Sequence, residues 1–360
     1  MRLQPKGDIL IMACAKDEGP YLLEWIAHYL ALGADRFIVV TNDCSDGTDL
    51  MLDRLDELGL VRHLPNPTMV TKFEKPIQHV AIRYASLQRE FRRANWRMVL
   101  DLDEFLNIRA GAGRFEDLFE VAGNFDAISF NQVVFGSGGI ETIEDVQSPL
   151  IFNQRYQFEK NTPRRAARMY GIKTLSRNDN SLFSRVSNHV AMLNGRRKRD
   201  PVWLDGSGKP MHAEFLKRRS RSYPSFKLRK KESAGREVHK YPIDHGTHDL
   251  GYIHHYAVRS LASFIVQGRR GDAMVKKASR DLDYWKTFDR NEVEDRSLHA
   301  ITQFAAGHLA ELRADRLLGE LHEAAVDLHR KWFRKLTKTP EVAELVSRCK
   351  AWTAAERDRF

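Results

Sequence analysis

The first 135 residues alternate between strand-like and helix-like segments, and this alternation constrains the possible folds more than any other feature of the sequence. Short apolar runs occur at 9–14, 37–41, 61–64, 97–102 and from 126 onward. Segments with helical periodicity lie between them, at 19–33, 45–59 and 77–94. Strands that alternate with helices predict an α/β fold with a mostly parallel central sheet flanked by helices.

The pattern changes in the second half of the chain. Residues 136–200 show a weaker alternation, and residues 200–250 are basic and rich in Gly, Pro and Ser, which indicates loops. The segments 257–280 and 296–350 have helical periodicity. The sequence therefore predicts a helical C-terminal extension, whose apolar faces favour packing on the core over binding a partner.

Three carboxylates, Asp101, Asp103 and Glu104, follow the strand-like run 98–100. Acidic residues are poor strand formers and are costly to bury without a partner, so we expect the strand to end here. In an extended segment Asp101 and Asp103 point the same way, because side chains alternate with a period of two. Two carboxylates on one face suit Mg²⁺ or Mn²⁺, although a lone D-x-D is also common as a pair of surface acids.

Polar side chains also follow the first two predicted strands. Lys16, Asp17 and Glu18 come after the first strand, and Asn42 and Asp43 come after the second. Ligands of open α/β sheets bind at the carboxyl ends of the strands. If these strands are neighbours, their polar ends and the carboxylates of the D-x-D segment line one crevice.

The net charge of +10 limits the classes of partner. Basic side chains cluster at 164–168, 195–199, 217–222 and 227–231. Such clusters attract nucleic acid, anionic lipid or phosphorylated substrates, or they are a solvated basic surface. Only three cysteines occur, widely spaced, which is typical of a reducing cytoplasm, and no apolar run approaches the ~20 residues that span a bilayer. We read the apolar N-terminal stretch as a first strand, not as a signal peptide.

The sequence lacks the motifs of several enzyme classes, which disfavours Rossmann dehydrogenase chemistry, and it has one further candidate site. There is no Walker loop, no strand–GxGxxG–helix unit, no GxSxG elbow and no HExxH. His254 and His255 lie between Tyr252 and Tyr256. One of these histidines is a candidate to complete a metal site begun by carboxylates, and the alternative is a pair of histidines making ordinary hydrogen bonds.

Two segments resemble a known enzyme family, namely MACAKDEGPYLLEWIAHYLALGADRFIVVTNDCSDGT and WRMVLDLDEFL. They are similar to glycosyltransferase family 2-like proteins with the GT-A fold, and more narrowly to the branch related to glycosyltransferase family 92. The similarity continues through NQVVFGSGG, GIKTLSRN, SNHV, WLDGSGKP and HHYAVRSLASFIVQGRRG, and covers residues 8 to 275. The chain departs from the family at three places. It has Asp17 where relatives often have Asn, and Arg259 where they often have Lys. It has Gln267 or Arg269 at a further position where relatives often carry Lys.

The resemblance implies a nucleotide-sugar donor, commonly a UDP-sugar, and a divalent metal ion, Mn²⁺ or Mg²⁺. It implies that Asp103 ligates the metal, that Asp101 contacts the ribose or a metal-bound water, and that His255 is the C-terminal metal ligand, with His254 as the fallback. The remaining donor-binding residues that it implies are Lys16, Asp17, Glu18, Asn42 and Asp46 near the nucleoside, and Lys173 and Arg259 near phosphate or acceptor.

Enzymes of this kind are expected to invert the anomeric centre, which requires a base that deprotonates the acceptor. Glu141, Glu144 and Asp145 are the candidates, with Glu141 favoured, and the alternative is a solvated acidic loop. The resemblance also implies a GT-A-like domain over 1–280, with a nucleotide-binding half at 1–135 and an acceptor half at 136–280, followed by a helical extension at 281–360.

The sequence thus predicts a cytoplasmic, metal-dependent glycosyltransferase that acts on a cell-surface or lipid-linked glycan. Its basic clusters would hold it at anionic inner-membrane lipid or engage an anionic acceptor. Two alternatives stay open: a nucleotidyl- or phosphotransferase on the same fold, and a basic nucleic-acid-binding protein. Aromatic residues are sparse in the basic runs and no nucleic-acid module is present, so we expect no nucleic-acid partner.

Overall fold

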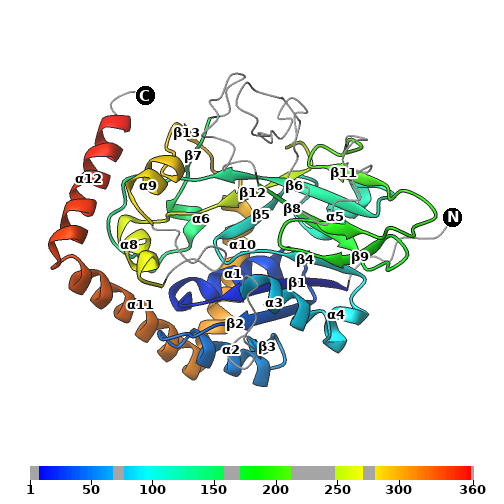
Figure 1. The fold of residues 1–360 in the computed structure, drawn as a ribbon, viewed down its shortest axis with the longest axis horizontal. Helices are drawn as coiled ribbons and strands as arrows, with labels where there is room; N and C mark the ends of the chain where they lie inside the picture. The colour runs from blue at the N-terminus through cyan, green and yellow to red at the C-terminus, as the bar shows by residue number, and fades with distance from the viewer. Residues whose placement is uncertain (1–7, 68–76, 158–170, 212–247, 271–279, 358–360) are drawn as a thin grey trace.

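The computed structural model describes residues 8–67, 77–157, 171–211, 248–270 and 280–357 (Figure 1). Three of the four basic clusters, at 164–168, 217–222 and 227–231, lie outside the described residues, as does most of the segment after 270 in the predicted helix 257–280.

A nine-stranded sheet forms the centre of the molecule, in the order β3-β2-β1-β4-β8-β6-β12-β5, with β11 beside β6. The strands are β1 (Ile9–Ala15), β2 (Arg36–Thr41), β3 (Arg62–Pro65), β4 (Trp96–Val99), β5 (Glu104–Ile108), β6 (Ala127–Val134), β8 (Ile172–Arg177), β11 (Trp203–Asp205) and β12 (Gly251–His255). Strands β3, β2, β1 and β4 are parallel, and β8 and β5 run antiparallel to their neighbours. The predicted fold class, α/β with a mostly parallel sheet flanked by helices, is confirmed.

Helices cover both faces of the sheet because its strands alternate two apolar sets of side chains. In β1, Ile9 and Ile11 face one core and Leu10 and Met12 face the other. The first core takes in α1 (Gly19–Ala31), α2 (Thr48–Glu57) and α5 (Phe115–Ala122). The second core takes in α3 (Ile77–Ala85) and α4 (Arg89–Arg93). Two-sided burial explains the near-continuous apolar runs of the parallel strands.

The predicted C-terminal helices pack on the core. They are α10 (His299–Ala314), α11 (Arg316–Leu336) and α12 (Pro340–Arg357), preceded by α8 (Leu261–Arg270) and α9 (Leu282–Phe288). Leu309, Leu312 and Leu318 are buried in the same core as β1 and α1, and Cys349 of α12 is buried beside α8 and α9. Figure 1 shows α11 and α12 along one side of the molecule, with α11 beside α1 and α2.

The remaining short elements are α6 (Ser148–Ile151), the pair β7 (Gln154–Arg155) and β13 (Val293–Glu294), and the hairpin β9 (Phe183–Val186) and β10 (Ala191–Leu193). No helix in the described part of the chain has both the length and the apolar character needed to cross a bilayer.

The structure corrects two sequence-based boundaries. The single helix predicted over 77–94 is divided into α3 and α4, because the backbone turns at 86–88, where Ser86 Oγ donates a hydrogen bond to the Arg83 carbonyl. The carboxylates after β4 do end that strand, as predicted. The chain then enters β5 at Glu104, a strand that the sequence analysis did not anticipate, because its pairing partner β12 lies far along the chain.

Candidate active site

A cleft of about 470 Å³ opens at the carboxyl ends of β1, β2 and β4. Six residues predicted from the sequence line it together: Lys16, Glu18, Asn42, Asp101, Asp103 and His255. The strands β2, β1 and β4 are neighbours in the sheet, so their polar ends meet at one edge, as the sequence analysis expected.

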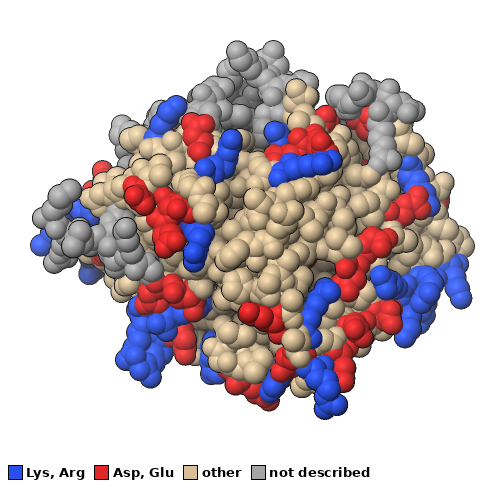
Figure 2. All heavy atoms as spheres, turned by 180° about the vertical axis from the view of Figure 1, so that it is seen from behind, with Lys and Arg blue, Asp and Glu red and all other residues tan. Residues whose placement is uncertain are grey.

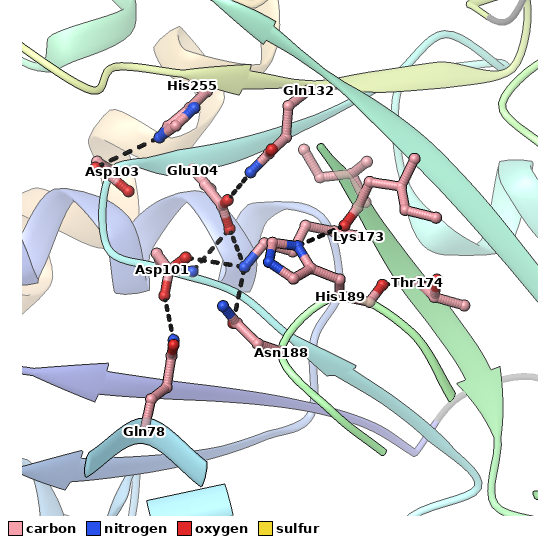
Figure 3. Close-up of polar contacts among 12 residues, drawn as sticks. Gln78, Asp101, Asp103, Glu104, Gln132, Lys173, Thr174, Asn188, His189 and His255 are labelled. Carbon is pink, nitrogen blue, oxygen red and sulfur yellow. Dashed lines mark hydrogen bonds and ion pairs between the residues drawn. The ribbon is translucent and has the colours of Figure 1, made fainter. Parts of the chain in front are cut away.

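Asp103 and His255 face each other at the cleft, with 3.6 Å between Asp103 Oδ2 and His255 Nε2 (Figure 3). The pairing of β12 with β5 places His255 opposite Glu104, and the Tyr256 backbone N–H donates to the Asp103 carbonyl over 2.8 Å. Burial raises the pKa of Asp103, but His255 and Arg259 outweigh it and hold the pKa well below its usual range. Burial lowers the pKa of His255, but Asp103 outweighs it and raises the pKa.

A carboxylate and an imidazole that face each other are ligands that suit Mn²⁺. Among the described residues, no group of three or more His, Cys, Asp or Glu side chains is arranged to hold a metal ion. If Asp103 and His255 held such an ion, its other ligands would come from water and a bound phosphate, as is common for Mg²⁺ and Mn²⁺.

The Asp101 carboxylate is held from two sides. Lys173 Nζ lies 2.9 Å from Asp101 Oδ2, and Gln78 Nε2 donates to Asp101 Oδ1 over 2.8 Å (Figure 3). Lys173 is also 2.9 Å from Glu104 Oε2 and donates to Asn188 Oδ1 over 3.0 Å. Burial lowers the pKa of Lys173, but the charges of Asp101 and Glu104 outweigh it and raise the pKa. Lys173 therefore lies beneath the cleft as a counter-ion of Asp101 and does not line it.

Arg259 also lies behind the cleft. Its guanidinium is fully buried, donates to the Leu102 carbonyl over 2.8 Å and pairs with Glu18 Oε2 at 3.1 Å. It stacks on the ring of Tyr21, 3.7 Å from the ring centroid. Arg259 has a positive φ of 51°, a conformation that non-glycine residues rarely adopt. The side chain thus braces the turn that carries Asp103, while its sequence-based assignment to phosphate or acceptor stays a prediction.

Asp17 and Asp46, predicted to border the nucleoside, hold the two loops of the cleft together. Asp17 Oδ1 accepts a hydrogen bond from the Ser45 backbone N–H over 2.6 Å. Asp46 Oδ2 accepts from the Gly19 backbone N–H over 2.9 Å. Neither carboxylate is among the residues that line the cleft. From the same two loops, Lys16, Glu18 and Asn42 line it.

The three candidates for the base lie apart from the cleft-lining residues. Glu141 lines a separate cavity of about 230 Å³ and pairs with Lys350 of α12. Asp145 Oδ1 lies 2.9 Å from His322 Nε2, and it also pairs with Arg313; together these two groups lower the pKa of Asp145. Glu144 accepts a hydrogen bond from the Thr142 hydroxyl. The structure does not bring these carboxylates to Asp103, and their role stays a prediction.

The two histidines of β12 have different environments. His254, the fallback metal ligand, points into the core: it is buried, stacks on Phe135 with 4.1 Å between ring centroids, and bonds Tyr256 Oη through Nδ1. Burial lowers the pKa of His254 to about 3, so its ring is neutral. Adjacent strand residues point to opposite faces, so of these two histidines only His255 lines the cleft.

The sequence analysis missed several residues of the cleft, namely Asn66, Gln78, Gln132, His189, Arg280, Tyr284 and Phe288. Gln132 donates to the Glu104 carboxylate, and burial lowers the pKa of His189 to about 4. His189 belongs to the SNHV segment noted above, which was the available signal. Gln132 likewise belongs to the NQVVFGSGG segment noted above. The remaining residues come from segments whose position depends on tertiary packing, and they had no signal of their own.

Comparisons with known proteins include a match to a family model. Residues 14–204 match the model for glycosyltransferase family 92. No curated protein matches the chain.

Three solved structures illustrate a weak structural similarity. Staphylococcus aureus TarS 1–349 shares 10% identity, with a TM-score of 0.28 over 47% of each chain. The same protein in complex with UDP shares 11% identity, with a TM-score of 0.28 over 47% of this chain and 46% of that one. The Saccharomyces cerevisiae mannosyltransferase Ktr4p shares 12% identity, with a TM-score of 0.23 over 38% of this chain and 42% of that one. This chain thus spans under half the length of each of them, and TM-scores this low carry no functional argument.

Proposed function

The chain belongs to glycosyltransferase family 92 and is a glycosyltransferase, and from this premise we propose that its cleft binds a UDP-sugar with Mn²⁺ or Mg²⁺ and transfers the sugar to a glycan. The observation that carries the proposal is the meeting of Asp103 and His255 at the cleft. They come from segments far apart in the sequence, and both are residue types that bind such ions.

Each cleft residue then has a proposed task. Asp103 and His255 would hold the divalent ion, and a bound ion would supply positive charge to the nucleoside diphosphate leaving group. Asp101, oriented by Lys173 and Gln78, presents its carboxylate to the ribose or to a bound water. Lys16 and Asn42, at the ends of the neighbouring strands β1 and β2, contact the nucleotide.

Transfer with inversion needs a base for the acceptor hydroxyl, and Glu141, Glu144 and Asp145 remain the proposed candidates. Replacing each by its amide separates them. A fall in kcat of about 10²–10⁴-fold with unchanged donor binding identifies the base. An unchanged kcat in all three variants assigns the base to a carboxylate of the cleft instead.

The acceptor that we propose is a cell-surface or lipid-linked glycan, reached from the cytoplasmic face of an anionic membrane. Of the basic clusters, the one at 195–199 lies within the described residues. Figure 2 shows one face of the molecule, on which acidic and basic side chains are interspersed around a central uncharged area. Sedimentation with vesicles of anionic or neutral lipid tests the membrane contact directly.

Calorimetric titration with UDP, with and without Mn²⁺, tests the nucleotide site. We expect binding that requires Mn²⁺ in the wild type and is lost in Asp103→Asn. Asp200→Asn, which changes an exposed carboxylate outside the cleft, should bind as the wild type does. Analysis of the products then separates sugar transfer, which releases intact UDP, from nucleotidyl or phosphoryl transfer, which does not.

A further inference from the structure

The C-terminal helix α11 lies outside the segment that matches the family model. It contacts one of the two loops at the cleft directly, through His329 and Asp46, and it reaches the other through Arg269, which contacts both Trp332 and Asp17. One loop leads from β1 to α1 and carries Lys16 and Glu18, and the other leads from β2 to α2 and carries Asn42. Hydrogen bonds connect the two loops, so the positions of their cleft-lining residues depend on one another.

Asp46 is the centre of this connection. Its carboxylate accepts hydrogen bonds from the backbone N–H of Gly19, where the first loop meets α1, and of Thr48, where the second loop meets α2, each over 2.9 Å. The hydroxyl of Thr48 in turn accepts from the Glu18 backbone N–H over 2.9 Å. The position of Glu18 at the cleft therefore depends on the orientation of the Asp46 carboxylate.

His329 of α11 completes the shell around Asp46. Its Nε2 lies 2.9 Å from Asp46 Oδ2, and both side chains are almost fully buried. A carboxylate accepts only, so the imidazole donates this bond. Because Asp46 is buried, loss of this donor leaves one of its oxygens with one partner fewer at a site that water does not reach readily.

A second contact from the same helix reaches Asp17. Trp332 is one turn beyond His329, with 4.9 Å between the two ring centroids. The guanidinium of Arg269 lies over the Trp332 ring, 3.9 Å from its centroid, and 3.8 Å from Asp17 Oδ2. Asp17 has a positive φ of 50°, which for a non-glycine residue is retained only where the surroundings impose it.

We propose that α11 is a clamp that holds the two cleft loops in their nucleotide-binding geometry, with His329 as the positioning residue for Asp46 and Trp332 as the positioning residue for Asp17 through Arg269. Helix α11 is then part of the donor site, although none of its residues lines the cleft. This inference rests on the proposed nucleotide-binding function of the cleft.

The chain provides a matched control on the same helix. His322 is as buried as His329, at 2% exposure each, and its Nε2 also lies 2.9 Å from a carboxylate oxygen, that of Asp145. Asp145 does not border the cleft. His322→Ala and His329→Ala thus remove equivalent side chains from one helix, and only the second removes a contact to the cleft loops.

Two measurements on the full chain test the clamp. The first is hydrogen exchange of the backbone amides of Glu18, Gly19 and Thr48 without nucleotide. The second is the Kd for UDP with Mn²⁺. We expect His329→Ala to speed exchange at these amides and to weaken UDP binding about tenfold or more, because small misplacements of positioning groups have effects up to about 10²-fold. His329→Gln, which keeps a donor, should restore part of both.

We expect His322→Ala to leave the Kd for UDP and the exchange rates of these three amides unchanged. Trp332→Leu should weaken UDP binding, as His329→Ala does. Equal effects of His322→Ala and His329→Ala in both measurements would overturn the clamp, because they would report general loosening of the helix. A wild type that binds no UDP would refute the proposed donor and not the clamp, which amide exchange then decides.

Discussion

The ammonium of Lys173 lies 2.9 Å from the Glu104 carboxylate, and neither side chain is exposed to solvent. Lys173 comes from β8 and Glu104 begins β5, so the pair joins two strands that are not neighbours in the sheet. The same ammonium contacts Asp101, which lines the cleft. This buried network therefore links the stability of the sheet to the orientation of a carboxylate that lines the cleft.

Removing the Lys173 cation from this network should lower the free energy of unfolding of the protein. In Lys173→Met two carboxylates lose their counter-ion, and breaking a buried ion pair costs about 3–5 kcal/mol of unfolding free energy. Denaturant unfolding measures this loss. Lys173→Met combined with Glu104→Gln should recover part of it, whereas Lys209→Met, at an exposed lysine, should change little. A double variant no more stable than Lys173→Met would contradict the account.

The adjacent histidines of β12 should respond differently to substitution. His255→Asn should abolish Mn²⁺-dependent UDP binding and change Tm by only a few degrees, because its ring faces the cleft. His254→Asn should lower the unfolding free energy by about 2 kcal/mol, because its ring is packed in the core. Calorimetric titration and thermal unfolding of both variants give the comparison, and retained Mn²⁺ dependence in His255→Asn would exclude it as a ligand.

Gly19 should not tolerate a methyl group. A Cβ at this position would lie 2.6 Å from the Ala325 Cβ of α11 and 3.1 Å from Asp46 Oδ2. Gly19→Ala should cost about 1–3 kcal/mol through overpacking, and Ala325→Gly in the same chain should relieve part of it. As a control, Gly307→Ala in α10 meets no neighbouring atom and should be neutral or stabilising by about 0.5–1 kcal/mol. Equal stability of the two alanine variants would disprove the close packing of α11 on this loop.

Stability should fall as the pH is lowered below 7, in part because of His28. Burial lowers the pKa of His28 to about 4, and its Nε2 bonds the Leu106 carbonyl over 3.0 Å. The unfolded state, with its higher pKa of about 6.5, binds the proton first, so stability is retained above about pH 6.5 and is lost as the pH falls toward 4. His28→Gln should reduce the loss between pH 7 and 5 by about 2 kcal/mol. Denaturant unfolding at both pH values checks this, and an unchanged pH dependence would refute it.

The sequence by itself determined the α/β class and the position of the crevice. The alternation of apolar runs and amphipathic segments sets which residues form strands, and polar residues after β1, β2 and β4 mark the strand ends that meet at one edge. Six cleft-lining residues followed from this local information, together with the resemblance for His255. Two boundaries were predicted wrongly: α3 and α4 were taken as one helix, and β5 was not anticipated. Both depend on contacts with other segments, which a local pattern does not contain.

Only the tertiary structure decided which polar groups face the cleft and which support it. Asp46 and Asp101 are both acids that follow a strand, and the sequence does not distinguish them. In the structure the Asp46 carboxylate is buried against His329, whereas Asp101 lines the cleft. Lys173 became a buried counter-ion because β8 inserts between β4 and β6. Such roles depend on contacts between segments far apart in the chain, and burial and charge pairing at these contacts leave no periodic trace in the sequence.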